Sequence, residues 1–320
     1  MIELKNIHQA QEQIKDIINE TPILTSTELS SICGNRMFLK GEHVQKTGSF
    51  KIRGATNKVK QAVKEGATYV TAASSGNHGQ AVAYIANVLG VPATIVVPED
   101  ASVSKMNAIK SYKGEIEKCG TTSAERLPRA VDLAESKNGV FIPPYDDPYI
   151  IAGQGTVGLE ILNQLDDVDA IVVPIGGGGL ISGILTAIKE TKPHVKVIGV
   201  EPEIAQDTYL SLRNGKITSI AGTRTIADGL RTSQPGDLTF PIVQKYLDDL
   251  VLVSEAEIRQ ALFFVLERMK QLIEPSSAVA VAAAMFDKLG VRDKKVACVI
   301  SGGNLDVLKL GQLFPEEVIG

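Results

Sequence analysis

The chain has 320 residues, of which 44% are hydrophobic and 22% are charged, as in a globular protein of one large domain or two smaller ones. Its net charge is −4 with no basic block, so nucleic-acid binding has no electrostatic support. No apolar run reaches the roughly 20 residues of a membrane span, and the polar start lacks the layout of a secretory signal. The three cysteines form no CxxC pair. We therefore expect a reduced, cytoplasmic protein without a membrane or nucleic-acid partner.

The N-terminal part of the chain predicts a helix, a short strand and a second helix. Apolar residues recur at near-helical spacing over residues 4–20, which predicts a surface helix packed on a larger body. Residues 36–40 (RMFLK) predict a strand, and residues 51–65 predict a helix. Between these two elements lies the stretch GEHVQKTGSFKIRGA, residues 41–55, whose centre is Lys51.

Strands and helices alternate regularly from Thr68 onward, which predicts a parallel sheet with right-handed crossovers. This block has the length of a small domain of four strands. Pro128 falls inside its third helix, and we expect it in the first turns of that helix. The predicted strands are 68–74, 93–100, 115–120 and 140–146, and the predicted helices are 75–90, 102–114 and 123–139.

A second alternation starts at Ile151, and its apolar strands and Ala-rich helices are typical of a sheet covered on both faces. Residues 204–237 are polar, and we predict that they are irregular. The two blocks together predict an α/β protein of two domains, each an open, mostly parallel sheet with helices on both faces. The predicted elements of the second block are helices over 151–165, 177–190, 254–270 and 274–290 and strands over 169–176, 196–202, 248–253 and 294–304.

Lys51 is the side chain to which we assign the chemistry. Lysine forms Schiff bases with aldehydes, and it becomes a usable base when its pKa is depressed. A small polar run (Thr47, Gly48, Ser49) and Phe50 precede it. Two Gly/Ser-rich turns between a strand and a helix follow downstream. One amine and two anion-binding turns together predict a phosphorylated aldehyde cofactor that is held at both ends.

The two downstream turns differ in the anion that they suit. The first turn, Ser74–Gly79, offers helix-start N–H groups with Ser and Asn side chains, which suits a carboxylate, although an ordinary helix cap is the alternative. The second turn consists of Gly176, Gly177, Gly178 and Gly179. It lets the backbone approach an oxyanion closely at a helix N-terminus, which suits a bare phosphate better than a dinucleotide.

Four motifs occur in a fixed order along the chain: KTGSFKIRGA, SSGNHGQ, GGGGLISG and SGGN. Together they resemble the fold type II pyridoxal-phosphate enzymes of the threonine/serine dehydratase (ammonia-lyase) and serine racemase family, over nearly the whole chain. The resemblance implies that Lys51 binds pyridoxal 5'-phosphate. It also implies that the lysine turn belongs with the second block. Residues 68–147 then form a small domain inserted into a large cofactor-binding domain of residues 1–67 and 148–320.

The resemblance implies roles for the residues around the cofactor. Phe50 would stack against the ring, although simple core packing is the alternative from the sequence alone. Asn77 would bind the phenolic oxygen, and the loop Gly176–Gly179 would hold the phosphate. Ser301 would face the pyridine nitrogen, where a hydroxyl leaves the ring a weaker electron sink than a carboxylate would. Glu274 corresponds to a family carboxylate near the cofactor.

The resemblance also implies a substrate site and a metal site. The first turn would bind the substrate α-carboxylate, and we interpret His78 as structural because Lys51 already supplies the base. The segment VEPEIAQD resembles the divalent-metal site of serine racemases, with Mg²⁺ or another hard cation in a structural or activating role. Solvated acids in a loop are the alternative. The implied substrate-binding residues are Ser74, Ser75, Gly76, Asn77, His78 and Arg126, and the implied metal ligands are Glu201, Ala205 and Asp207.

The implied reaction is β-elimination from L-threonine or L-serine, which gives a 2-oxo acid and ammonia, with Lys51 taking the α-proton. A serine racemase would use the same site with Ser75 as a second acid/base, but the segment PPYDDPYIIAGQGT is closer to threonine dehydratases. A 3-hydroxyaspartate dehydratase would need an extra cation, for which Arg126 and Arg224 are candidates. A protein that only binds a small molecule is the alternative from another class. We expect a homodimer, because twofold-symmetric dimers are the commonest soluble oligomers. A nucleotide effector is a further candidate partner.

Overall fold

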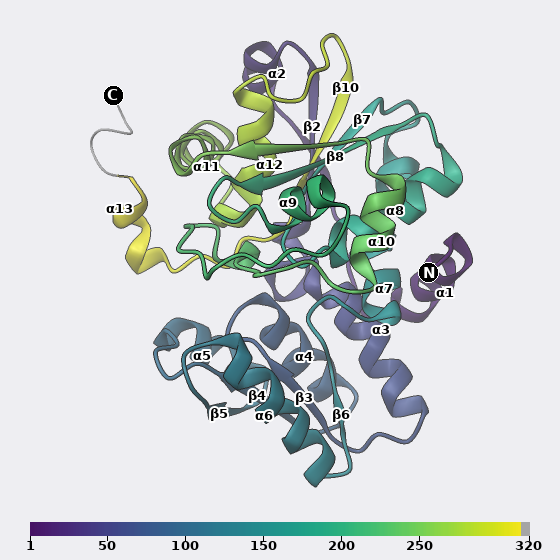
Figure 1. Ribbon diagram of the computed structural model, residues 1–320, viewed down its shortest axis with the longest axis vertical. Helices are drawn as coiled ribbons and strands as arrows, with labels where there is room; N and C mark the ends of the chain where they lie inside the picture. The colour runs from purple at the N-terminus through teal and green to yellow at the C-terminus, as the bar shows by residue number, and fades with distance from the viewer. Residues whose placement is uncertain (315–320) are drawn as a thin grey trace.

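The structure is a computed structural model that describes residues 1–314, leaving out the side chain of Ser123. The end of the predicted large domain, residues 315–320, lies outside the described part. Two α/β bodies stack along the longest axis of the molecule (Figure 1), and each contains one sheet. No helix among the described residues is long and apolar enough to cross a membrane. The α/β architecture predicted from the alternation is confirmed.

The larger body contains a six-stranded sheet. Its first strand pairs antiparallel to the second and forms one edge, and all the other strands pair in parallel. Parallel strands need crossover connections, which the helices between them provide. In spatial order the strands are β1 (Ile23–Thr25), β2 (Arg36–Gly41), β10 (Lys295–Ile300), β7 (Ala170–Pro174), β8 (Lys196–Pro202) and β9 (Asp249–Val253).

Helices cover both faces of the larger sheet, so its central strands are buried on both sides and read as apolar runs. One apolar cluster lies under α2 (Thr27–Cys33), α11 (Glu255–Met269) and α12 (Pro275–Met285). The opposite cluster lies under α1 (Leu4–Ile14), α7 (Pro148–Gln164), α8 (Gly179–Thr191) and α10 (Thr239–Tyr246). Two shorter helices, α9 (Asp207–Asn214) and α13 (Leu310–Leu313), complete this body.

The smaller body contains a parallel four-stranded sheet built only from residues 70–141. The cluster on one of its faces includes side chains of α4 and α5, and Ala130 and Leu133 of α6 pack against Val96 on the other. The strands in spatial order are β5 (Glu115–Lys118), β4 (Ala93–Val97), β3 (Val70–Ala73) and β6 (Val140–Phe141), and the helices are α4 (Asn77–Val88), α5 (Val103–Ser111) and α6 (Ser123–Ser136).

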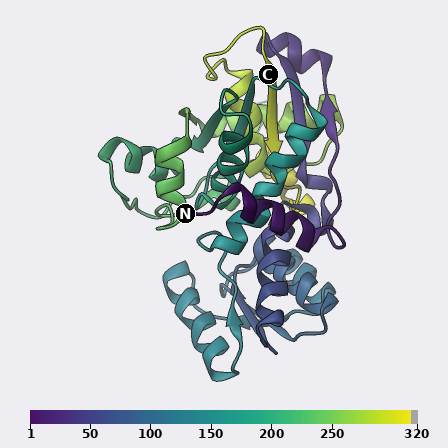
Figure 2. The same ribbon diagram turned by 90° about the vertical axis from the view of Figure 1, so that its right-hand side faces the viewer.

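Helix α3 (Lys51–Lys64), which begins at the candidate lysine, joins the two bodies. Its residues Ile52, Ala55 and Val59 pack into the core of the smaller sheet. Its Gly54 lies against α7, where an added Cβ would come within 2.7 Å of the Ile150 carbonyl oxygen. Backbone contact therefore fixes α3 on α7, and α1 lies across the same junction (Figure 2). We propose that the two sheets define two domains with the boundaries predicted at residues 67 and 148.

Several predicted boundaries differ from the structure. The first helix ends at Ile14 rather than at residue 20, because the chain turns there toward β1. Residues 204–237 are not wholly irregular, since they contain α9, whose polar residues Asp207, Thr208 and Ser211 are buried. Helices α2 and α10 were not predicted. Helix α7 begins at Pro148, three residues earlier than predicted, because the Asp147 carboxylate accepts hydrogen bonds from the N–H groups of its first turn.

Candidate active site

The lysine turn and the SGGN turn are hydrogen bonded to each other, although 250 residues of chain separate Ser49–Lys51 from Ser301. The N–H of Phe50 donates to the carbonyl of Ser301 at 3.0 Å, and the N–H of Gly303 donates to the carbonyl of Gly48 at 2.9 Å. Ser49 and Gly302 form an antiparallel bridge. These contacts place the start of α3 at the carboxyl end of β10, where ligands bind in open α/β sheets.

The Lys51 amine lies at the junction of the two bodies. Its Nζ donates to the carbonyl of Pro144 at 2.7 Å and lies 5.2 Å from the centre of the Phe50 ring. Burial lowers the pKa of Lys51 from 10.5 to about 8, and the nearby Glu274 carboxylate partly opposes this shift. A larger fraction of the amine is therefore neutral near pH 8 than for an ordinary lysine, as a nucleophile or base requires.

The lowered pKa of Lys51 predicts how fast the cofactor-free protein binds a phosphorylated aldehyde. Only the neutral amine attacks, so the rate of cofactor uptake should rise with pH and level off above about 8. An ordinary lysine would keep the rate rising past pH 10. Stopped-flow absorbance from pH 6 to pH 10 measures the profile, with a model amine as the control for ionisation of the cofactor itself. A profile that rises without a plateau to pH 10 would contradict the assignment.

The turn predicted to bind a carboxylate lies at the start of α4. Ser74, Ser75, Gly76 and Asn77 are partly exposed, and an added Cβ at Gly76 would meet no atom within 4 Å, so this turn borders open space. The Ser74 Oγ accepts from the N–H of Gly76 at 3.2 Å, which holds the turn. The first N–H groups of a helix have no partner within that helix, so those at the start of α4 suit an anion.

His78 differs from its neighbours because its side chain is buried. Its Nε2 lies 2.8 Å from the carbonyl oxygen of Ile142, so the ring ties α4 to the segment after β6. Burial, with the Lys51 charge as a second cause, lowers the pKa of His78 to about 3. A neutral, hydrogen-bonded ring agrees with the structural role that we predicted for this histidine.

Asn77 is held by a polar cluster that crosses the two bodies. Its Nδ2 donates to both carboxylate oxygens of Glu274, at 2.9 and 3.1 Å, and its Oδ1 accepts from the Asn304 Nδ2 at 2.7 Å. Burial, and then the charge of Asp228, raise the pKa of Glu274 to about 7. The structure therefore brings together Asn77, Glu274 and the SGGN turn, which the motifs placed only in sequence order.

The glycine loop is closely covered by residues that the sequence did not single out. A Cβ added at Gly177 would lie 2.4 Å from the ring of Tyr145, and one added at Gly178 would lie 2.8 Å from Thr239. Gly178 has φ of +89°, a conformation that side-chain-bearing residues rarely adopt. Only glycine therefore fits this loop, and its backbone is free to cradle an anion before α8.

The residues present fit a cofactor with an aldehyde, a phosphate and a ring nitrogen. Lys51 supplies the amine, the glycine loop supplies the phosphate cradle, and the buried Ser301 hydroxyl lies 3.1 Å from the Ser277 hydroxyl at the end of β10. The Ser49 hydroxyl is fully buried and has no hydrogen-bond partner among the described residues, beside the bridge to Gly302. Phe50 is partly buried and also packs on the core, so both predicted roles agree with its position.

The predicted metal ligands lie in the turn between β8 and α9. Glu201 accepts from the N–H groups of Thr208 at 3.0 Å and Tyr209 at 2.9 Å, so it caps α9. Burial raises the pKa of Glu201 to about 8, with Asp207 as the second cause, and burial raises that of Asp207 to about 7. Ala205, which lies between the two acids in the sequence, is buried as well. Two buried, mutually repelling carboxylates beside a backbone turn fit a hard cation.

Arg126 lies on α6, where burial lowers its pKa and the charges of Asp100, Cys119 and Glu125 oppose the shift. Its predicted role in binding the substrate stays a prediction. Several of the residues that the sequence interpretation did not single out lie in one segment, Pro144–Asp147. In this segment the Pro144 carbonyl accepts a hydrogen bond from the Lys51 amine, and Tyr145 covers the glycine loop. The carboxylates of the next two residues accept hydrogen bonds from N–H groups at the starts of α10 and α7. Its signal was the Asp-Asp-Pro sequence, which is typical of a helix start.

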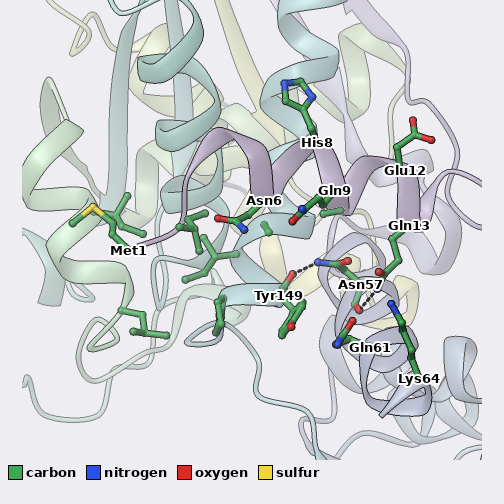
Figure 3. A pocket seen from close by; sticks show the side chains of 17 residues that line it. Met1, Asn6, His8, Gln9, Glu12, Gln13, Asn57, Gln61, Lys64 and Tyr149 are labelled. Carbon is green, nitrogen blue, oxygen red and sulfur yellow. Dashed lines mark hydrogen bonds between the residues drawn. The ribbon is translucent and has the colours of Figure 1, made fainter. Parts of the chain in front are cut away.

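A large hollow of about 1150 Å³ lies elsewhere on the molecule. Asn6, Gln9 and Gln13 of α1 face Asn57 and Gln61 of α3 across it (Figure 3). Tyr149, at the start of α7, lines the same hollow. Neither Lys51 nor either anion-binding turn lines it, so it is separate from the candidate active site.

Comparison with known proteins decides the family. Residues 14–302 match the family described as pyridoxal-phosphate dependent enzyme. The chain belongs to this family. Pyridoxal phosphate is therefore its cofactor, as the motifs predicted, and the fold type II assignment is confirmed.

Relatives within the family carry several activities. The chain is 45% identical to an L-threonine ammonia-lyase of Thermotoga maritima over 100% of this chain and 80% of the relative. It is 41% identical to an L-threo-3-hydroxyaspartate ammonia-lyase of Saccharomyces cerevisiae over 98% of this chain and 97% of the relative. The solved structure of maize serine racemase superposes with a TM-score of 0.93 at 38% identity, covering 97% of this chain and 96% of that one.

Proposed function

We propose that the protein is a pyridoxal-phosphate-dependent ammonia-lyase that converts L-threonine and L-serine to a 2-oxo acid and ammonia. The observation that carries this proposal is the Lys51 amine: its acceptor Pro144 precedes Tyr145, which covers the glycine loop, and its charge acts on His78 in the other turn. The turn at Ser74–His78 suits the α-carboxylate of an amino acid, and the glycine loop suits the cofactor phosphate. The threonine ammonia-lyase relative supports the same activity.

The cofactor, when bound, supplies an electron sink that makes the α-proton of an amino acid acidic. Lys51 would hold the cofactor through its amine and would then take this proton, for which its lowered pKa suits it. Asn77 and the glycine loop would hold the cofactor from its two ends. Ser301 lies beside a second hydroxyl, that of Ser277. A hydroxyl partner favours prompt loss of the β-hydroxyl over a long-lived carbanion.

Ser75 supports a second outcome at the same site. It is partly exposed in the turn that borders open space, so its hydroxyl suits the acid/base on the opposite face that serine racemisation needs. We propose it as a catalytic residue for that side reaction. The superposition with a serine racemase supports this proposal.

An assay on four substrates tests the proposed function. Cofactor-loaded protein is given L-threonine, L-serine, D-serine and L-threo-3-hydroxyaspartate, and 2-oxo acid, ammonia and the chirality of serine are followed. We expect rapid 2-oxo acid release from L-threonine and L-serine. Inversion of serine as the dominant reaction, or turnover confined to hydroxyaspartate, would overturn the substrate assignment and keep the cofactor chemistry.

We propose that Glu201, Asp207 and the Ala205 carbonyl bind Mg²⁺ in a structural role. A cation at 100 times its Kd should raise the free energy of unfolding by about 2.7 kcal/mol, and EDTA should remove the effect. Thermal unfolding of the cofactor-loaded protein with and without Mg²⁺ measures it, and Glu203→Gln, an exposed neighbour, serves as the control. An equal Mg²⁺ response in the variant with Glu201→Gln and Asp207→Asn would contradict the site.

We further propose a cytoplasmic homodimer that acts on small β-hydroxy amino acids, without a nucleic-acid or membrane partner. The three unpaired cysteines, Cys33, Cys119 and Cys298, support a reducing compartment. The dimer rests on the prevalence of twofold symmetry among soluble oligomers. Titration with purine nucleotides during the threonine assay would detect a nucleotide effector.

A further inference from the structure

We propose that Asp228 is a specificity-determining residue, which pairs with Lys105 and thereby keeps that lysine from binding a second carboxylate on the substrate. This inference rests on the proposed function and deepens it. It predicts a preference for β-hydroxy amino acids with neutral side chains over acidic ones such as 3-hydroxyaspartate. The two residues come from different bodies of the protein and meet beside the candidate active site.

Asp228 belongs to a short 3-10 helix, Asp228–Leu230, that forms a wall between the two ends of the site. At one end, a Cβ added at Gly176 would lie 3.3 Å from the carbonyl oxygen of Gly229. At the other end, a Cβ added at Gly229 would lie 3.7 Å from the Glu274 carboxylate, which holds Asn77. This wall, the 3-10 helix Asp228–Leu230, therefore extends from the glycine loop toward the turn at Ser74–His78.

Lys105 reaches this wall from the first turn of α5, in the smaller body. Its Nζ forms an ion pair with the Asp228 carboxylate, and the neighbouring Ser104 hydroxyl donates to Asp306 at 3.2 Å. The Lys105 and Asp228 side chains are 30% and 38% exposed, so both remain accessible to solvent and to a ligand. The charges of both partners act on Glu274: the charge of Asp228 raises its pKa, and the charge of Lys105 lowers it.

This cation differs from the two that the sequence suggested for an acidic substrate. Arg126 lies near Asp100, Cys119 and Glu125 within the smaller body. Arg224 is exposed in the loop that precedes the wall. Lys105 is the cation that the structure places on the wall itself, and there its charge is balanced by Asp228. A second substrate carboxylate would have to compete with Asp228 for Lys105 and would be repelled by Asp228.

Replacing Asp228 by asparagine tests the proposal, because it removes the competing charge and keeps the shape. We expect the ratio of kcat/KM for L-threo-3-hydroxyaspartate to that for L-threonine to rise by about tenfold. Adding Lys105→Met to the same variant should return the ratio toward the wild-type value. Because the pair is partly exposed, the gain in the Asp228→Asn variant should shrink as NaCl is raised.

A binding measurement separates this proposal from the proposed function. L-aspartate and L-2-aminobutyrate lack a β-hydroxyl, and their binding to the holoenzyme is followed by the change in visible absorbance. Asp228→Asn should tighten aspartate relative to aminobutyrate, even if the wild-type protein proves not to be an ammonia-lyase. An unchanged ratio in both experiments, or an equal change for acidic and neutral ligands, would overturn the proposal and leave the ion pair as a contact between the two bodies.

Discussion

Replacing Arg53 by methionine should lower the free energy of unfolding by about 3–5 kcal/mol, because it breaks a buried ion network and leaves carboxylates unpaired. Arg53 has no exposed side-chain surface and bonds two carboxylates. Its Nε donates to Glu42 at 2.8 Å, and its Nη1 donates to Glu160 at 2.6 Å. Lys40 also donates to Glu160 at 2.6 Å, which balances two cations against two anions.

The network matters to the site because Arg53 lies two residues after Lys51 and ties the start of α3 to the turn that follows β2 and to α7. Denaturant unfolding of the cofactor-free protein measures the loss. The matched control is Arg268→Met, an exposed arginine paired with Glu28, which should change the free energy of unfolding by less than about 1 kcal/mol. Equal stability of the two variants would show that the buried network does not hold α3 in place.

Replacing Gly178 by alanine should weaken pyridoxal-phosphate binding by about 10- to 100-fold. The residue has φ of +89°, where a side chain costs roughly 1–2 kcal/mol, and the new Cβ would lie 2.8 Å from Thr239. Thr239 donates its hydroxyl to the Gly177 carbonyl at 2.8 Å, so the clash would also displace the neighbouring residue of the cradle.

Equilibrium titration of the cofactor-free protein with pyridoxal phosphate, followed by absorbance, measures this effect. Gly222→Ala is the control, because an added Cβ at Gly222 would meet no atom within 4 Å and its φ is not positive. The control should bind the cofactor as tightly as the wild-type protein. Unchanged affinity in the Gly178 variant would show that the loop does not hold the phosphate.

The sequence predicted those parts of the site that are local motifs at the ends of strands. Lys51, the glycine loop and the SGGN turn follow strands of the larger sheet, and the turn at Ser74–Gly79 follows β3 of the smaller one. The carboxyl ends of parallel strands gather at one edge of each sheet. The strand–helix alternation predicted the two sheets because each strand and helix has its own local hydrophobic pattern.

The parts that the sequence did not predict depend on contacts between distant residues. Tyr145 covers the glycine loop and Lys105 meets Asp228 only because the smaller body folds back onto the larger one. Helix α9 reads as irregular because its buried polar residues depend on Glu201, which caps its N-terminus from β8. The partners of Arg53 likewise lie up to 107 residues away along the chain. A single arginine in a polar motif therefore does not predict a buried ion network.

The most direct test of the account measures 2-oxobutanoate and ammonia released from L-threonine by the cofactor-loaded protein and by its Lys51→Ala variant. Lys46→Ala, a change in the same stretch, is the matched control. We predict equal amounts of the two products from the wild-type protein, activity retained in the control, and a loss of about 10⁴-fold in the Lys51 variant. A Lys51 variant that still releases 2-oxobutanoate at the wild-type rate, or a cofactor-loaded wild-type protein that releases none, would contradict the account.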